Sequence, residues 1–493
     1  MAAVLVQEEH RVNDVHSALN ATRVREAIDV RSIGDIRDAL HRARQLELPL
    51  AICGGRHAMG GQQFATDALL LDTRKMRRVL GFDRTRGLVE AEAGIQWPEL
   101  IAWLRYVQHG EPSPWGITQK QTGADTFTLG GSLSANIHGR GLAMRPFIDD
   151  VEAFSLVDAA GRVRRCSRTR ESDLFRLAIG GYGLFGVIVS VTLRLSRVRK
   201  LRRVVEIIDL DALLPAFEER IAAGHLYGDF QFAIDPGGEG FLRRGVLSCY
   251  QPVADGTPMP ERQLSLVERD WERLIHLAHT DKSAAFERYA SFYLATSGQL
   301  YWSDTQQLST YLDGYHRRVD AHLGHRGSEV ITEIYVPRRA LVDFMAAAAA
   351  DFRAQGVDLI YGTVRLIRRD EESFLPWARQ DYACVIFNLH ARHTTAGIAH
   401  TAAALRRLIE MAIARDGSFY LTYHRYATRE QVARCYPGFR DFLAAKRAHD
   451  PQELFQSDWY RHYRNLFAQE PCHDGEQSQQ DRVGRRSQSG VPA

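Results

Sequence analysis

Hydrophobic residues repeat with a helical period near the start of the chain. Within residues 30–47, one helical face carries the apolar side chains Ile36, Ala39, Leu40 and Ala43. Ser32 precedes this face and is expected to act as its N-cap, and residues 97–107 predict a second helix. Short apolar runs predict strands at residues 48–53, 68–72, 78–82 and 87–91. Helices that alternate with short strands predict an α+β fold with sheet packed on helix.

Alternating hydrophobic positions predict strands further along the chain. Residues 187–195 carry valine or leucine at every second position, which predicts a half-buried strand. Residues 151–158 and 163–167 predict a hairpin around Gly161. Residues 200–415 are less clearly patterned, with helices expected at 260–279 and 338–355 and strands at 330–336, 359–367 and 382–390. A chain of 493 residues should hold two domains or three.

Two glycine-rich segments carry the first functional signal. Residues 54–61 read Gly-Gly-Arg-His-Ala-Met-Gly-Gly and follow an apolar run that predicts a strand. Glycine permits tight turns, and its backbone N–H groups can face an anion, so His57 would lie beside the bound group. The alternative is an ordinary glycine turn with an exposed histidine. Residues 122–141 combine glycine with serine, threonine and asparagine, which suit phosphate and ribose contacts.

A third glycine motif argues against one class of cofactor. Residues 181–186 match Gly-x-Gly-x-x-Gly, which in a dinucleotide-binding βαβ unit follows a strand and opens a helix. Here the motif follows an expected helix at 172–179 and opens the expected strand at 187–195. The reversed order leaves no helix N-terminus for a pyrophosphate, so NAD binding is rejected at this motif.

Composition excludes several classes of partner. The chain is 45% hydrophobic and 25% charged with a net charge of +3, which is typical of a globular protein and gives no argument for nucleic acid. No apolar stretch approaches the length of a membrane span. Six scattered cysteines lack metal-binding spacing, so reduced thiols, a cytoplasmic location and no metal site are expected. The N-terminus lacks the features of a signal peptide, and the polar residues from 471 onward predict a disordered tail.

A series of sequence blocks, in a fixed order, carries a family resemblance over about residues 20–198. After the helix and the loop at 54–61 come Leu-Leu-Leu-Asp72, Val-Glu90-Ala-Glu-Ala-Gly94, Thr-Leu-Gly130-Gly131-Ser, His138-Gly139 and the motif at 181–186. Residues 436–439 and 450–457 match the C-terminal end of sugar-lactone oxidases. The chain thus resembles FAD-linked oxidases of the vanillyl-alcohol oxidase and p-cresol methylhydroxylase (PCMH) type, and its pattern is nearest to members similar to sugar-lactone oxidases.

The resemblance implies a two-part PCMH-type FAD-binding domain with an inserted α+β cap domain. Residues 1–198 would form the FAD-binding domain, 199–415 the cap or substrate domain, 416–470 a return segment on the FAD-binding domain, and 471–493 the disordered tail. The implied cofactor is FAD. Its expected contacts are Gly54, Gly55, Arg56, His57, Ala58, Met59, Gly60, Thr122, Gly123, Thr128, Gly130, Gly131, Ser132, Ser134, Asn136, Gly186 and Ile188.

The resemblance also implies a covalent flavin. Many members attach the flavin to the histidine of Gly-x-Gly-His-Ser, and His57 falls at that position although Ala58 replaces the serine. Members with a second link carry a cysteine near the next glycine block. This chain has Gly123-Ala-Asp there, so a single link through His57 is expected.

Four residues are catalytic candidates by the same resemblance. Residues 419–425 are expected to form a strand that returns to the flavin, so only one of Tyr423 and His424 would face it. Alignment favours Tyr423, and titration near neutrality favours His424, while simple packing of both remains the alternative. His138 would orient substrate, stabilise reduced flavin or fill the core. Arg365 corresponds to the arginine of a Glu-x-Arg pair on the cap sheet, but Thr363 replaces the glutamate.

These features lead to one principal hypothesis and two alternatives. The principal one is an FAD-dependent oxidoreductase that transfers hydride from a CH–OH group of a small-molecule substrate to the flavin and is reoxidised by oxygen or another acceptor. The alternatives are a flavin-dependent oxidative cyclisation or desaturation, and a flavin-free binding protein on the same fold. Thr363 argues against a standard aldonolactone or polyol substrate. Lys120, Lys446 and Arg425 would serve an acidic substrate or lie on the solvated surface.

Overall fold

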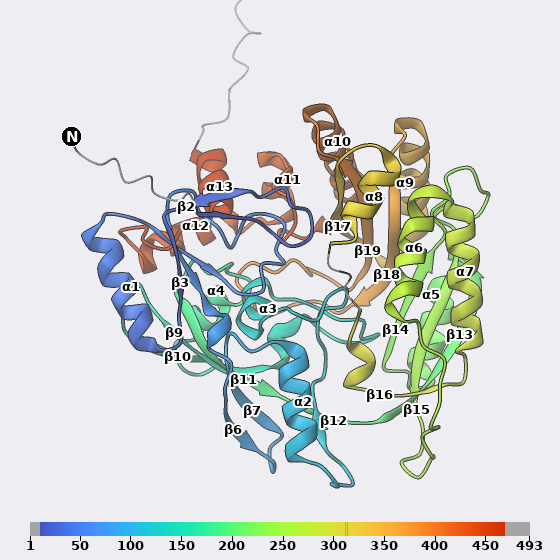
Figure 1. Cartoon of the computed structure of the whole chain (residues 1–493), viewed down its shortest axis with the longest axis horizontal. Coiled ribbons are helices and arrows are strands. Elements are labelled where there is room, and N and C mark those ends of the chain that lie inside the picture. The colour runs from blue at the N-terminus through green and yellow to red at the C-terminus, as the bar shows by residue number, and fades with distance from the viewer. Residues whose placement is uncertain (1–9, 311, 313, 469–493) are drawn as a thin grey trace, which may run out of the picture.

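The computed structural model describes residues 10–310, 312 and 314–468. The tail expected at 471–493 and the start of the chain at 1–9 lie outside the described residues. The chain folds into two halves that lie side by side, one built from its N-terminal and C-terminal elements and the other around an eight-stranded sheet (Figure 1). A short ribbon of β1 (His10–Val12) and β2 (Thr22–Val24) precedes both.

A three-stranded parallel sheet in the order β3-β5-β4 carries the first glycine loop. Its strands are β3 (Glu26–Asp29), β4 (Leu50–Cys53) and β5 (Leu69–Asp72). Helix α1 (Ile33–Gln45) has Ser32 as N-cap in a capping box, and its buried residues are Ile36, Ala39, Leu40 and Ala43. The helix, its cap and its buried face are therefore confirmed. Because β4 ends at Cys53, the loop 54–61 leaves the carboxyl end of a strand, as predicted.

A five-stranded sheet in the order β10-β9-β11-β7-β6 forms the rest of this half. Its strands are β6 (Val79–Asp83), β7 (Leu88–Glu92), β9 (Val151–Val157), β10 (Val163–Ser167) and β11 (Val187–Arg194). The prediction of a half-buried β11 is wrong, since residues 187–193 are all buried. Val187 and Val189 pack in one hydrophobic cluster with the buried residues of α1. Ile188 and Val191 belong to a second, larger hydrophobic cluster, so both faces of β11 are covered.

Short helices and strands connect these sheets. They are α2 (Trp97–Val107), β8 (Trp115–Gly116), α3 (Leu129–Ala135), α4 (Ser172–Ala178) and β12 (Ser196–Arg197). The motif at 181–186 lies between α4 and β11. Its order is thus helix then strand, which confirms the reason for rejecting NAD binding there.

The second half is built on a sheet in the order β16-β13-β15-β14-β18-β19-β17-β20. Its strands are β13 (Lys200–Asp209), β14 (Tyr227–Phe232), β15 (Arg244–Pro252), β16 (Leu300–Trp302), β17 (Gly327–Pro337), β18 (Leu359–Ile367), β19 (Tyr382–Arg392) and β20 (Ser418–Phe419). Its helices are α5 (Leu213–Ala222), α6 (Glu268–Thr280), α7 (Lys282–Ala295), α8 (His316–Leu323), α9 (Leu341–Gln355) and α10 (Thr395–Ile413). Helices α6 and α7 pack on the sheet through Val205 and Val246.

Two expected elements of this region are shorter than the sequence pattern suggests. The helix expected at 260–279 begins only at Glu268, because residues 260–267 form a loop around Pro260. The strand expected at 419–425 is limited to Ser418–Phe419, and residues 421–423 turn away from the sheet. The alternation argument for Tyr423 and His424 therefore does not apply.

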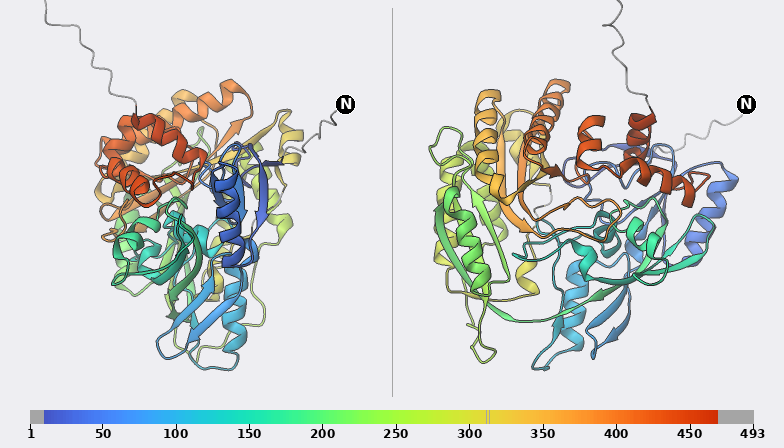
Figure 2. Two further views of the ribbon diagram at one scale, coloured as in Figure 1. Left: turned by 90° about the vertical axis from the view of Figure 1, so that its left-hand side faces the viewer. Right: turned by 180° about the vertical axis from the view of Figure 1, so that it is seen from behind.

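The C-terminal segment returns to the first half (Figure 2). Its helices are α11 (Arg429–Cys435), α12 (Phe439–His449) and α13 (Asp458–Ala468). The backbone of Leu50 in β4 exchanges hydrogen bonds with Leu454 (2.7 Å) and Gln456 (2.8 Å). Residues more than 400 positions apart thus hold the strand that carries the first glycine loop.

Two general features follow from the described residues. None of their helices combines the length and the apolar character needed to cross a membrane. Their cysteines are buried and unpaired, namely Cys53, Cys166, Cys249, Cys384 and Cys435. Cys472 lies outside the described residues.

Candidate active site

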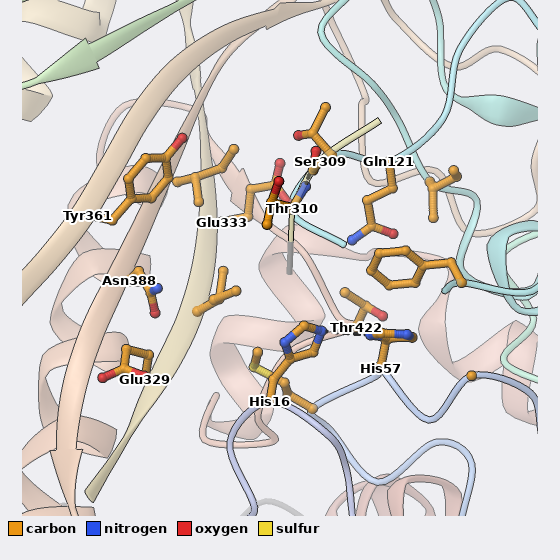
Figure 3. A pocket seen from close by; sticks show the side chains of 18 of the residues that line it. His16, His57, Gln121, Ser309, Thr310, Glu329, Glu333, Tyr361, Asn388 and Thr422 are labelled. Carbon is orange, nitrogen blue, oxygen red and sulfur yellow. Dashed lines mark hydrogen bonds between the residues drawn. The ribbon is translucent and has the colours of Figure 1, made fainter. Parts of the chain in front are cut away.

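A cavity of about 720 Å³ lies between the glycine loops of the first half and the eight-stranded sheet of the second. Figure 3 shows its two walls: His57 and Gln121 come from the loops, whereas Glu329, Tyr361 and Asn388 come from the sheet. This volume falls within the range of about 300–1,000 Å³ that is typical of small-molecule and cofactor sites.

The glycines of the loops allow the backbone to approach closely. A Cβ at Gly54 would lie 2.1 Å from Thr128 Oγ1, and a Cβ at Gly130 would lie 2.9 Å from that of Ala93. Gly186 has φ of 145°, and a Cβ there would lie 2.6 Å from the Val157 carbonyl oxygen. Side chains at these positions would push apart the segments that surround the cavity, so glycine is required for these segments to pack closely.

The structure brings most of the expected FAD contacts to one wall. The lining includes Gly54, Gly55, Arg56, His57, Ala58, Met59, Thr122, Gly123, Thr128, Gly130, Gly131, Ser134, Gly186 and Ile188. Three expected contacts do not line it. Ser132 Oγ accepts from Trp97 Nε1 at 3.1 Å, Asn136 Nδ2 donates to Asp370 Oδ2 at 2.9 Å, and the Gly60 N–H donates to Gln62 Oε1 at 3.0 Å. Each of these groups is occupied by a partner within the protein.

His57 is held on both sides of its ring. Its Nδ1 lies 2.9 Å from His16 Nε2, and its Nε2 lies 2.9 Å from Thr126 Oγ1. The ring of Phe127 packs against it with centroids 4.1 Å apart. Burial, with a smaller effect of His16, lowers the pKa of His57 to about 3, so the imidazole is neutral and keeps a nucleophilic lone pair.

A buried carboxylate, Glu333 of β17, lies at the centre of the opposite wall. Its Oε1 accepts from His138 Nε2 at 2.5 Å and from Cys384 Sγ at 2.7 Å. Its Oε2 accepts from the Tyr423 hydroxyl at 3.1 Å. Two predicted catalytic residues, His138 and Tyr423, therefore meet at a glutamate that was not predicted.

The electrostatics of this cluster favour an ionised glutamate. Burial opposes ionisation, but His138 and the hydrogen bond from Cys384 outweigh it and hold the pKa of Glu333 below its ordinary value. Burial together with the Glu333 carboxylate raises the pKa of Tyr423 well above its ordinary value. Tyr423 is therefore a neutral hydrogen-bond donor and not a phenolate base.

The other two catalytic candidates differ in position. Arg365 lines the cavity, and its buried Nε has no hydrogen-bond partner among the described residues. His424 does not line the cavity: its Nε2 lies 3.1 Å from Ser17 Oγ, and its ring stacks on Tyr426. Burial lowers the pKa of His424 to about 4.

Two lysines expected at the surface are in fact buried. Lys120 Nζ lies 2.9 Å from Asp125 Oδ1, and Lys446 Nζ lies 2.5 Å from Asp450 Oδ2. Both lysine side chains are 0% exposed. The expectation of a solvated role is wrong for both, because a buried ammonium requires a nearby counter-charge, and Asp125 and Asp450 supply it.

Residues 26–167 match the FAD binding domain family. This segment is therefore an FAD-binding domain, as the resemblance to PCMH-type oxidases predicts. FAD is its cofactor, and the cavity wall of glycine loops belongs to this FAD-binding domain.

Two curated relatives each match about a third of this chain. An L-gulonolactone oxidase of Mus musculus is 31% identical over 164 residues, which cover 33% of this chain and 35% of the relative. Cytokinin dehydrogenase 3 of Arabidopsis thaliana is 30% identical over 169 residues, which cover 34% of this chain and 31% of the relative. The matched region thus spans about a third of the length of these relatives. The solved structure of a solvent-stable cholesterol oxidase shares the fold, with a TM-score of 0.68, 15% identity, and coverage of 92% of this chain and 97% of that chain.

Outside the FAD-binding domain, part of the cavity wall comes from residues of four adjacent strands. They are Asp229 and Gln231 of β14, Tyr361 and Arg365 of β18, Ile386 and Asn388 of β19, and Glu329, Ile331 and Glu333 of β17. Successive side chains of a strand point to opposite faces, so this set occupies one face of the sheet. The sequence offered one signal for this wall: Glu329 and Glu333 lie four residues apart, on or beside the expected strand at 330–336.

Proposed function

We propose that this protein is an FAD-dependent oxidoreductase that removes hydride from a CH–OH carbon, with Glu333 receiving the hydroxyl proton. The observation that carries the proposal is the buried Glu333 on the cavity wall opposite the FAD-binding domain, whose carboxylate accepts from His138 and Tyr423. We place the FAD-binding domain at 1–198, the cap domain at 199–415 and the return segment at 416–470. The flavin-free alternative does not fit the FAD-binding domain.

The residues of the first wall suit FAD. Gly54, Gly130 and Gly186 leave no room for a Cβ. Two buried polar atoms of this wall, Thr122 Oγ1 and Arg56 Nε, have no hydrogen-bond partner within the part of the chain described. When bound, FAD supplies the two-electron acceptor for the reaction. The neutral His57 has a lone pair for the expected histidyl attachment, and a covalent link to the flavin would replace its contact with His16 or with Thr126.

The opposite wall suits the management of one proton. A carboxylate oxygen can accept about two hydrogen bonds, so Oε2 of Glu333, which accepts from Tyr423, retains a lone pair for a substrate hydroxyl. Both ring nitrogens of His138 face acceptors, Glu333 Oε1 at 2.5 Å and the Gly139 carbonyl oxygen at 2.9 Å. His138 therefore anchors the carboxylate while Tyr423 orients it toward the cavity.

Arg365 adds a fixed positive charge to this wall. Guanidinium groups stay protonated in proteins, and the buried Nε of Arg365 lacks a partner among the residues described. A preorganised cation stabilises negative charge that develops during hydride transfer. Arg365 can have this role although Thr363 replaces the expected glutamate, because Glu333 lines the same cavity from another strand.

The far part of the cavity favours an apolar substrate body. Helices α6 and α7 and the loop before them contribute Leu264, Leu266, Trp271, Leu274, Ala278 and Phe286. Burying such surface contributes about 25 cal/mol per Å² and selects against polyols, whose hydroxyl groups would lose hydration. The fold relative is named for cholesterol, an apolar alcohol, which agrees with this reading.

Anaerobic reduction tests this proposal. The purified holoprotein is mixed without oxygen with bulky apolar alcohols, with polyols and with aldonolactones, and loss of the visible flavin absorbance is followed. The proposal expects bleaching by apolar alcohols and carbonyl products. A product with a new ring or C–C double bond would support oxidative cyclisation or desaturation instead, and bleaching by polyols alone would overturn the substrate class. Once the flavin is reduced, oxygen or another acceptor should restore its visible absorbance.

The five buried and unpaired cysteines support a cytoplasmic location for the protein.

A further inference from the structure

A second polar cluster lies on the same sheet face, about 13 Å along β17 from Glu333, given ~3.3 Å per strand residue. It joins His279 of α6, Glu329 of β17 and His390 of β19, and their nitrogen and oxygen ligand atoms all lie within 4.8 Å of one another. The side chains are 1%, 6% and 3% exposed. The proposed alcohol oxidation does not use this cluster.

The hydrogen bonds around the cluster fix the orientation of both imidazoles. His279 Nδ1 lies 2.9 Å from the Ile275 carbonyl oxygen and must donate to it, so Nε2 presents a lone pair when the ring is neutral. His325 Nδ1 lies 3.2 Å from the Leu323 carbonyl oxygen, which leaves His325 Nε2 as the acceptor for His390 Nε2 at 3.0 Å. His390 Nδ1 consequently presents its lone pair as well.

Both lone pairs converge on one carboxylate oxygen. Glu329 Oε1 lies 2.8 Å from His279 Nε2 and 3.4 Å from His390 Nδ1. Three electron-rich atoms in such proximity require a cation between them, either a proton or a metal ion. Ligand atoms of a tetrahedral zinc site with bonds of ~2.0–2.1 Å lie about 3.3 Å apart, which is close to this spacing.

We infer that His279, Glu329 and His390 form a binding site for a divalent transition-metal ion of the Zn²⁺ class, with two nitrogen ligands and one oxygen ligand. The carbonyl of Ile275 and the imidazole of His325 act as the outer partners that fix ligand orientation. Glu329 also lines the cavity, which provides an access route and room for a fourth ligand. Because the three ligands lie 50 and 61 residues apart, no short spacing motif could reveal them.

The other cluster of possible ligands is a poorer site. It combines His138, Glu333 and Cys384. A metal-bound cysteine must be a thiolate, whereas burial and the neighbouring Glu333 raise the pKa of Cys384 well above its ordinary value. The two clusters can be distinguished by experiment, since only the cluster with Cys384 offers a sulfur ligand.

Metal analysis of the whole holoprotein tests the inference. The protein is stripped with a chelator, dialysed against Zn²⁺ and measured by elemental analysis, calorimetric titration and X-ray absorption at the zinc edge. We expect one zinc per chain with a shell of nitrogen and oxygen only. Less than half an equivalent of zinc, or a sulfur ligand, would overturn the inference.

Variants locate the ion. Glu329→Gln and His279→Asn should each weaken zinc binding at least about 100-fold, since even loss of an outer partner costs ~10–100-fold. His276→Asn is the matched control, because His276 is an exposed histidine of the same helix whose ring contacts His322. Equal zinc affinity in Glu329→Gln and the wild type would refute the site, and an unchanged flavin content confirms that each variant is folded. Zinc affinity is measured without alcohol oxidation, so this test can fail while the proposed function holds, and the reverse.

Discussion

Replacing Gly54 by alanine tests whether close packing of the two glycine loops forms the FAD site. The new Cβ would lie 2.1 Å from Thr128 Oγ1, which is 1.3 Å short of ordinary contact at 3.4 Å. Thr128 cannot simply rotate away, because its Oγ1 accepts from the Gly131 N–H at 3.2 Å and caps α3. Losing this N-cap costs about 1 kcal/mol, and overpacking costs ~1–3 kcal/mol more.

The sum of about 2–4 kcal/mol corresponds to FAD binding that is weakened roughly 30- to 700-fold, at 1.4 kcal/mol per tenfold. The assay is a titration of the deflavinated protein with FAD, or the flavin-to-protein ratio after purification if the link is covalent. Gly256→Ala is the matched control, since nothing lies within 4 Å of a Cβ there. Adding Thr128→Ala to Gly54→Ala should recover only the part of the loss due to overpacking, because the N-cap of α3 stays lost. Normal FAD binding by Gly54→Ala would refute the reasoning.

Three further predictions concern single residues. His57→Ala should release all flavin into the supernatant on acid precipitation, while the wild-type precipitate stays yellow; flavin retained by the variant would contradict attachment at His57. Lys446→Met should lower the free energy of unfolding by about 3–5 kcal/mol in a denaturant titration, because it leaves the buried Asp450 carboxylate without its counter-charge. A loss below about 0.5 kcal/mol would mean that Lys446 is solvated. Burial raises the pKa of Asp150 from 3.8 to about 7, so its protonated form stabilises the fold below pH 3.8 and that contribution is lost as the pH rises through 7. Asp150→Asn should therefore be more stable than the wild type at pH 8, by up to about 4 kcal/mol, with no gain below pH 3.8; an equal gain at both pH values would disprove this linkage.

Local signals account for what the sequence could predict. The face and cap of α1 depend on residues within one helix, and the loop at 54–61 depends on an apolar run followed by glycine. The order of α4, the glycine motif and β11 could likewise be read from neighbouring residues. Each of these features is encoded within about 20 residues, where propensity and periodicity are informative.

The second cavity wall could not be predicted in the same way. Glu333 gains its role only because β17 pairs with β19 and because His138 and Tyr423 approach from the other half of the molecule. His16, which contacts His57, lies in a segment without hydrophobic periodicity. The buried Lys120 and Lys446 look like surface residues in the sequence, since their counter-charges are recognised only once the fold is known.

The central claim is that Glu333 takes the substrate proton on the wall opposite the FAD-binding domain. Its most direct test is the anaerobic rate of flavin reduction in Glu333→Gln, with an alcohol that bleaches the wild type. Removing a general base typically lowers the rate by ~100- to 10,000-fold, and we predict a loss in this range with unchanged flavin content. Glu92→Gln, a buried carboxylate paired with Arg78 outside the cavity, should reduce at the wild-type rate. Wild-type reduction by Glu333→Gln would contradict the account.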